Sequence, residues 1–166
     1  DMWRYEDGSV PTPFTAIGYD STKGSLVNLV TGQRISCLFN QNKAVRYCQL
    51  LASKGSAPLT LWPYHVRVGS THHPLMPLIS EVQMFHEICR LAEADTEIKG
   101  YQQFTESYGI VGDEIAEIDG ESVGEEVRKP FIDLLLKHKV VILDGEASSH
   151  CVRETVTQIK REFAKR

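Results

Sequence analysis

The sequence predicts an α/β fold, with a mainly parallel sheet between two layers of helices. Helical patterns alternate along the chain with short apolar runs of strand length, and this alternation is typical of a parallel sheet covered on both faces. The chain has 166 residues, of which 42% are apolar, as expected for one globular domain. We therefore expect a single domain over residues 1–166.

The first part of the chain predicts three strands and a helix. Turn residues surround two short apolar runs, and we expect strands at residues 26–30 and 35–39. Residues 41–53 have helical spacing of small and apolar side chains, and Gly55 follows as the stop signal. A third strand is expected at residues 59–62, because Pro63 ends that apolar run.

The middle of the chain predicts a second helix that begins at Pro77. Its apolar side chains step by four and three residues, and we expect them to face inward: Leu78, Val82, Phe85, Cys89 and Ala92. A short strand or strand end follows at residues 97–100. Residues 115–118, followed by Asp119 and Gly120, predict a turn or small hairpin.

The last part predicts a helix, a strand and a final helix. The helix should cover about residues 124–137 and the strand residues 140–143. A loop of small polar residues then leads to Cys151, where the next helical pattern begins.

Composition excludes several classes of partner. The net charge is −4 with both signs mixed, whereas duplex binding needs a clustered basic face. No apolar run is long enough to cross a membrane, and the first residues lack a signal-peptide pattern. The four cysteines are widely separated and have no paired metal-ligand spacing, so we expect reduced thiols in a cytoplasmic protein, although sequence leaves a disulfide open.

Cys151 is the first candidate functional residue. A helix N-terminus favours anions, so a cysteine there tends toward the reactive thiolate, and the same backbone N–H groups can bind a developing oxyanion. The alternative is that Cys151 is a small apolar residue that closes the corner between strand and helix.

Lys99 is the second candidate, because polar residues at the carboxyl ends of parallel strands commonly carry the chemistry of such folds. An ammonium beside Cys151 would stabilise the thiolate and later an anionic intermediate. The alternative is a solvated surface lysine.

An ordered set of motifs resembles the isochorismatase-like cysteine hydrolases, especially their nicotinamidase-like branch. Each motif alone is weak, but their order and spacing fit over about residues 59–163, whereas residues 1–58 match poorly. The motifs are Trp62-Pro63-Tyr64-His65, Gly69-Ser70, Lys99-Gly100, Glu106-Ser107-Tyr108 and the run Gly145-Glu146-Ala147-Ser148-Ser149-His150-Cys151-Val152.

The resemblance implies an amidohydrolase with Cys151 as nucleophile and Lys99 as the lysine of its catalytic triad. Hydrolysis of a small, nicotinamide-like amide would proceed through a thioester on Cys151. The bond between Glu146 and Ala147 matches a cis peptide of the family. The backbone N–H groups of Ala147 and Cys151 would then form the oxyanion hole.

The resemblance also implies a metal and a substrate pocket. His65 matches a ligand of a divalent metal, usually zinc, although an ordinary surface histidine is equally possible. Trp62 and Tyr108 match walls of a pocket for a flat substrate, with core packing as the alternative. No organic cofactor is implied.

The chain also departs from the family pattern. The family has an aspartate general base at the end of an early strand, but Asp1 has no strand before it. The upstream metal-binding histidines have no counterpart, since no histidine lies between Asp20 and Trp62. We therefore expect a domain without its N-terminal and C-terminal parts, whose exposed sheet edges favour a homo-oligomer. The alternative function is a catalytically impaired homologue that acts as a binding or assembly module.

Overall fold

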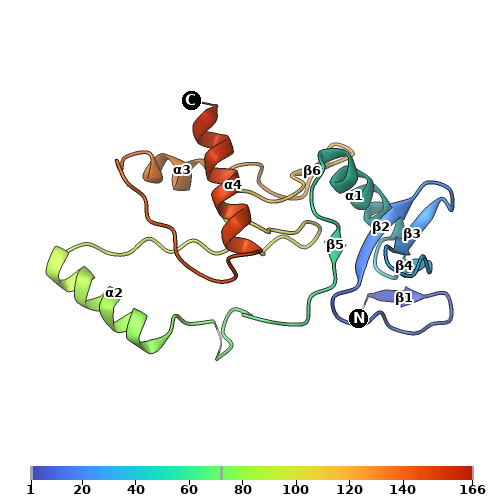
Figure 1. The fold of residues 1–166 in the computed structure, drawn as a ribbon, viewed down its shortest axis with the longest axis horizontal. Coiled ribbons are helices and arrows are strands. Elements are labelled where there is room, and N and C mark those ends of the chain that lie inside the picture. Colours follow the sequence, from blue (N-terminus) through green and yellow to red (C-terminus); the bar gives the residue numbers. More distant parts are fainter. Residues whose placement is uncertain (1, 72, 166) are drawn as a thin grey trace. The chain divides into compact units, whose positions relative to one another are not determined.

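The fold was analysed in a computed structural model, which describes residues 2–71 and 73–165. The chain divides into two compact units (Figure 1). The larger unit combines the residues up to Leu61 with those from Glu97 onward, and the smaller unit is Trp62–Thr96.

The predicted parallel sheet is wrong, because every strand pairing among the described residues is antiparallel and belongs to one of three small sheets. The pairs are β1 (Trp3–Tyr5) with β4 (Ile35–Cys37), β2 (Ala16–Asp20) with both β3 (Ser25–Asn28) and β5 (Leu59–Thr60), and β6 (Glu117–Ile118) with β7 (Glu121–Ser122).

Short turns explain two of these antiparallel pairs, β2 with β3 and β6 with β7. A parallel pair needs a crossover of a dozen or more residues, whereas β2 and β3 are joined by a turn in which the Asp20 carboxylate accepts hydrogen bonds from the backbone of Thr22 and Lys23. The predicted strands at 97–100 and 140–143 are absent. Val140 and Ile142 are 77% and 88% exposed, and no described strand lies beside them to complete a ladder.

Helix α1 (Gln41–Lys54) confirms the helix predicted at 41–53. The Asn40 side chain accepts a hydrogen bond from the N–H of Lys43, and Gly55 ends the helix in the left-handed conformation. Its buried face carries Tyr47, Cys48 and Leu51. These side chains join a core with residues from both parts of the larger unit, namely Ile17, Leu26, Ile35, Leu59, Ile115, Ile118 and Val123.

The hairpin of β6 and β7 confirms the turn predicted at Asp119 and Gly120. Both residues have positive φ, 50° and 86°, which is the conformation of a two-residue type I′ turn. The hairpin is fastened to α1 by two ion pairs, Lys43 with Glu121 and Arg46 with Asp119, each at 2.7 Å.

A second core cluster holds the C-terminal helices. Val111, Ile132 and Ile159 are its buried residues. Ile132 lies on α3 (Lys129–Leu135), which is shorter than the helix predicted at 124–137, and Ile159 lies on α4 (Cys151–Ala164).

The smaller unit contains α2 (Pro77–Arg90), which agrees with the helix predicted from Pro77. The predicted inward face is not buried in the structure; Leu78, Val82 and Phe85 are all exposed. None of the described helices is long and apolar enough to span a membrane.

Candidate functional site

Cys151 is the first residue of α4, as the sequence predicted, and it is half-buried. The preceding residue, His150, has non-helical backbone angles (φ −127°, ψ −96°), and residues 144–150 form an exposed loop. The thiol therefore lies where an exposed loop turns into a helix. In the first helical turn the N–H of Glu154 donates to the carbonyl of His150 at 2.9 Å.

The loop before Cys151 folds back on Ala147. The carbonyl of Ala147 accepts hydrogen bonds from the N–H groups of His150 (3.0 Å) and Val152 (3.2 Å). The peptide bond between Glu146 and Ala147 is cis, at the position where the resemblance implies one. Within the described part of the chain, the N–H groups of Ala147 and Cys151 have no hydrogen-bond acceptor, and their predicted role in an oxyanion hole stays a prediction.

Lys99 lies in an irregular segment and turns its ammonium group toward the backbone. Its Nζ donates hydrogen bonds to the carbonyls of Ser107 (2.9 Å) and Tyr108 (2.8 Å). The next residue, Gly100, donates its N–H to Ser107 Oγ at 3.2 Å. Lys99 is therefore half-buried and bound by two backbone carbonyls.

Helix α4 is docked on the same stretch of chain that holds Lys99. Thr155 Oγ1, one turn beyond Cys151, accepts the N–H of Ile110 at 3.2 Å. Gln158 Oε1 accepts the N–H groups of Val111 (3.0 Å) and Gly112 (3.3 Å). The segment 107–113 is therefore the common support of Lys99 and of the helix that carries Cys151.

No hydrogen bond or ion pair joins Lys99 directly to Cys151 among the residues that the structure describes. In the same part of the chain, no carboxylate is paired with either residue. Asp1, the one aspartate considered for the general base, lies outside the described residues. Cys151 and Lys99 thus stay candidate residues that are linked through segment 107–113, and no general base is assigned.

Two residues that sequence reasoning missed hold this region together, Asp113 and Gln158. The side chain of Asp113 is fully buried, and it accepts hydrogen bonds from Ser107 Oγ (2.5 Å) and the N–H of Glu125 (2.8 Å). The signal available for Asp113 was a pair of charged residues, Asp113 and Glu114, between the apolar Val111 and Ile115. For Gln158 the signal was a polar residue next to Ile159 on the inner face of α4.

Tyr108 is half-buried beside this region, and its hydroxyl donates to the carbonyl of Pro58 at 3.0 Å. Burial, followed by the nearby Tyr47, raises the pKa of Tyr108 above its ordinary value of 10.0. The predicted role in a substrate pocket stays a prediction, since Tyr108 belongs to the larger unit and Trp62 to the smaller one.

His65 and Trp62 lie together within the smaller unit. Their rings are 5.9 Å apart between centroids, and His65 Nδ1 is 2.6 Å from the carbonyl oxygen of Pro63. Among the described residues no group of three or more His, Cys, Asp or Glu side chains could hold a metal ion. The structure therefore gives His65 no partner ligands, and its role in zinc binding stays a prediction.

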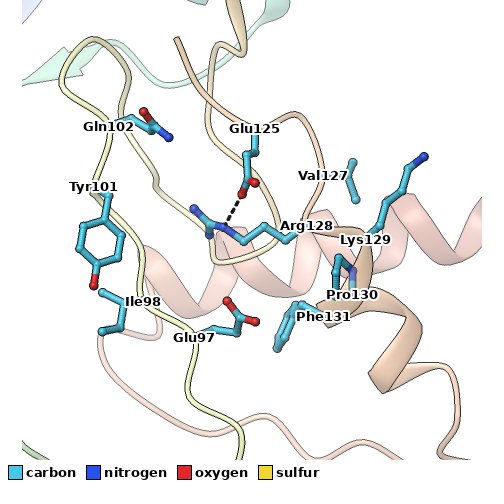
Figure 2. A pocket seen from close by; sticks show the side chains of 10 residues that line it. All are labelled: Glu97, Ile98, Tyr101, Gln102, Glu125, Val127, Arg128, Lys129, Pro130 and Phe131. Carbon is cyan, nitrogen blue, oxygen red and sulfur yellow. Dashed lines mark hydrogen bonds and ion pairs between the residues drawn. The ribbon is translucent and has the colours of Figure 1, made fainter. Parts of the chain in front are cut away.

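A pocket of about 470 Å³ is lined by residues of segments 97–102 and 125–131 (Figure 2). Ile98 and Tyr101 line one side and Arg128 and Phe131 the other, and Arg128 Nε donates to Glu125 at 3.1 Å. Cys151 is not among the described residues that line the pocket, so it does not contain the candidate nucleophile.

Comparisons with known proteins found no family model, no curated protein and no solved structure that matches this chain.

Proposed function

We propose that this chain is a cysteine amidohydrolase that cleaves a small, nicotinamide-like amide through a thioester on Cys151. One observation carries the proposal: the helix that begins with Cys151 and the ammonium of Lys99 are both held by the segment 107–113. Lysine and cysteine serve no shared structural purpose there, and catalytic sites are where such pairs collect.

The proposed chemistry has two steps. The sulfur of Cys151 attacks the amide carbonyl carbon, the C–N bond breaks, and ammonia leaves with the proton of the thiol. Water then attacks the thioester, which releases the carboxylic acid and restores the thiol. The ammonium of Lys99 stabilises the anionic species, and the N–H groups of Ala147 and Cys151 bind the oxyanion.

The experiment is to measure ammonia release from nicotinamide and a panel of small amides. We expect turnover by the unmodified chain, loss of it in Cys151→Ala, and wild-type rates in the control Cys89→Ala, since Cys89 is an exposed residue of α2. Turnover that survives Cys151→Ala would contradict the proposal.

A second candidate function is a catalytically impaired homologue that acts as a binding or assembly module. It is favoured by the missing base, because no carboxylate is paired with Lys99 or Cys151 in the described part of the chain. This alternative predicts that Cys151 reacts with alkylating reagents while no amide of the panel is hydrolysed.

The proposal includes a cytoplasmic location and association with a second copy of the chain. All four cysteines are free thiols, which is typical of a reducing compartment. In the described sheet β3-β2-β5, strand β5 lies at an edge, and an edge strand can bind another chain through its backbone. Bound zinc near His65 also remains part of the proposal.

A further inference from the structure

The buried carboxylate of Asp113 is the centre of a hydrogen-bonded network that ends at Lys99. One oxygen accepts the hydroxyl of Ser107 at 2.5 Å, and the other accepts the N–H of Glu125 at 2.8 Å. The guanidinium of Arg128 lies 3.5 Å away and supplies the opposite charge. With these partners the Asp113 carboxylate is held in one position, although the surrounding chain has no regular secondary structure.

Ser107 links Asp113 to Lys99 through hydrogen bonds. Its hydroxyl accepts the N–H of Gly100 at 3.2 Å, and its carbonyl accepts the ammonium of Lys99 at 2.9 Å. Ser107 is thus bound at both its side chain and its backbone, with Asp113 on one side and the pair Lys99 and Gly100 on the other. Rotation of the Ser107 hydroxyl away from Asp113 would release the Gly100 contact.

The network also determines how Lys99 can act. An ammonium group has three N–H donors, and the carbonyls of Ser107 and Tyr108 take two of them. One donor is left, and its direction follows from the other two. A lysine held in this way presents a single hydrogen bond to a neighbouring anion.

We propose that Asp113 and Ser107 are positioning residues, which hold the ammonium of Lys99 so that its remaining donor faces the thiolate of Cys151. The inference rests on the proposed function for the role of the pair and for the direction of the remaining donor, while the hydrogen bonds of the network carry the positioning of Lys99. Arg128 pairs with the Asp113 carboxylate at 3.5 Å and balances its charge.

The test compares Ser107→Ala with Thr105→Val. Both positions are buried, with 9% and 7% exposure, and both hydroxyl oxygens accept a backbone N–H. The Ser107 hydroxyl accepts from Gly100, the residue next to Lys99, and donates to Asp113, whereas the Thr105 hydroxyl accepts from Ile115. Thermal unfolding should show a similar loss of stability in the two variants. Only Ser107→Ala should change the site.

Two readouts separate positioning from a structural role. The first is the rate of Cys151 alkylation by iodoacetamide as a function of pH. A neighbouring cation shifts thiol ionisation by about one to three pH units, so Ser107→Ala should raise the midpoint by about one unit. The second is nicotinamide hydrolysis, where kcat should fall about tenfold and KM change less than about twofold.

Identical alkylation profiles in Ser107→Ala and Thr105→Val would overturn the inference, whether or not amides are hydrolysed. A raised midpoint in Ser107→Ala alone would support it. If that shift is seen and the unmodified chain hydrolyses no amide, the proposed function fails while the positioning of Lys99 beside Cys151 stands.

Discussion

Replacing Gln158 with methionine should loosen α4 from its support at little cost in volume. The Gln158 side chain makes three hydrogen bonds to the backbone of Val111 and Gly112, two through Oε1 and one through Nε2. Val111 and Gly112 are buried, so the variant leaves two N–H groups without an acceptor. Each such group costs about 1–3 kcal/mol, and partial relaxation leaves an expected total of about 2–4 kcal/mol.

Urea unfolding followed by circular dichroism measures this loss. The matched control is Thr157→Ala, because Thr157 is the neighbouring residue on the exposed face of α4 and bonds only within the helix. The control should change the free energy of unfolding by less than about 0.5 kcal/mol. A loss in Gln158→Met no larger than that of the control would refute the docking of α4 through Gln158.

Three further predictions follow from the structure. Alkylation at neutral pH should modify Cys151 first and Cys48 last, because burial, followed by the neighbouring Cys37, raises the pKa of Cys48 to about 12. Peptide mapping by mass spectrometry measures the order of labelling. Equal labelling of all four cysteines would contradict the prediction. The free energy of unfolding should fall as the pH rises above 10. Burial raises the pKa of Tyr47 and Tyr108 above the ordinary 10.0, so only the unfolded chain loses these protons at that pH. The double variant Tyr47→Phe, Tyr108→Phe should show a flatter decline, and an unchanged slope would contradict this explanation. Gly124→Ala should lower the free energy of unfolding by about 1–3 kcal/mol, since a Cβ there would lie 2.8 Å from Asp113 Oδ2. The control is Gly8→Ala, where a Cβ would meet no atom within 4 Å and only the positive φ has a cost. Equal effects of the two variants in thermal unfolding would contradict close packing at Gly124.

Local signals in the sequence were sufficient for several elements. The cap at Asn40 and the stop at Gly55 bound α1, Asp119 and Gly120 specify the turn of the last hairpin, and Cys151 begins α4 as predicted. These features depend on a few adjacent residues, so a single sequence carries them.

The pairing of the strands could not be predicted from such local signals. Pairing depends on which distant segments meet, and apolar runs such as 140–143 have the same composition whether or not a neighbour completes a ladder. The two strands that were missed, β1 and β2, lie in the turn-rich start of the chain, where Gly18 interrupts the β2 pattern.

The residues of the candidate site also differ in whether local sequence signals identify them. Cys151 and Lys99 were identified because their motifs are local and ordered along the chain. Asp113 and Gln158 were missed because their importance comes from backbone groups that lie 12 residues and 46 to 47 residues away in the sequence. The general base was identified neither from the sequence nor from the described residues.

The larger unit is discontinuous in sequence, since Trp62–Thr96 separates its two parts. Its core draws side chains from both parts, and hydrogen bonds such as Tyr108 to Pro58 and Glu106 to Tyr47 join them. A protease cut inside Trp62–Thr96 should therefore leave two fragments that stay associated without a covalent link. The same property makes this segment the natural place to divide the chain for fragment complementation, with recovery of the unit reporting on its core alone.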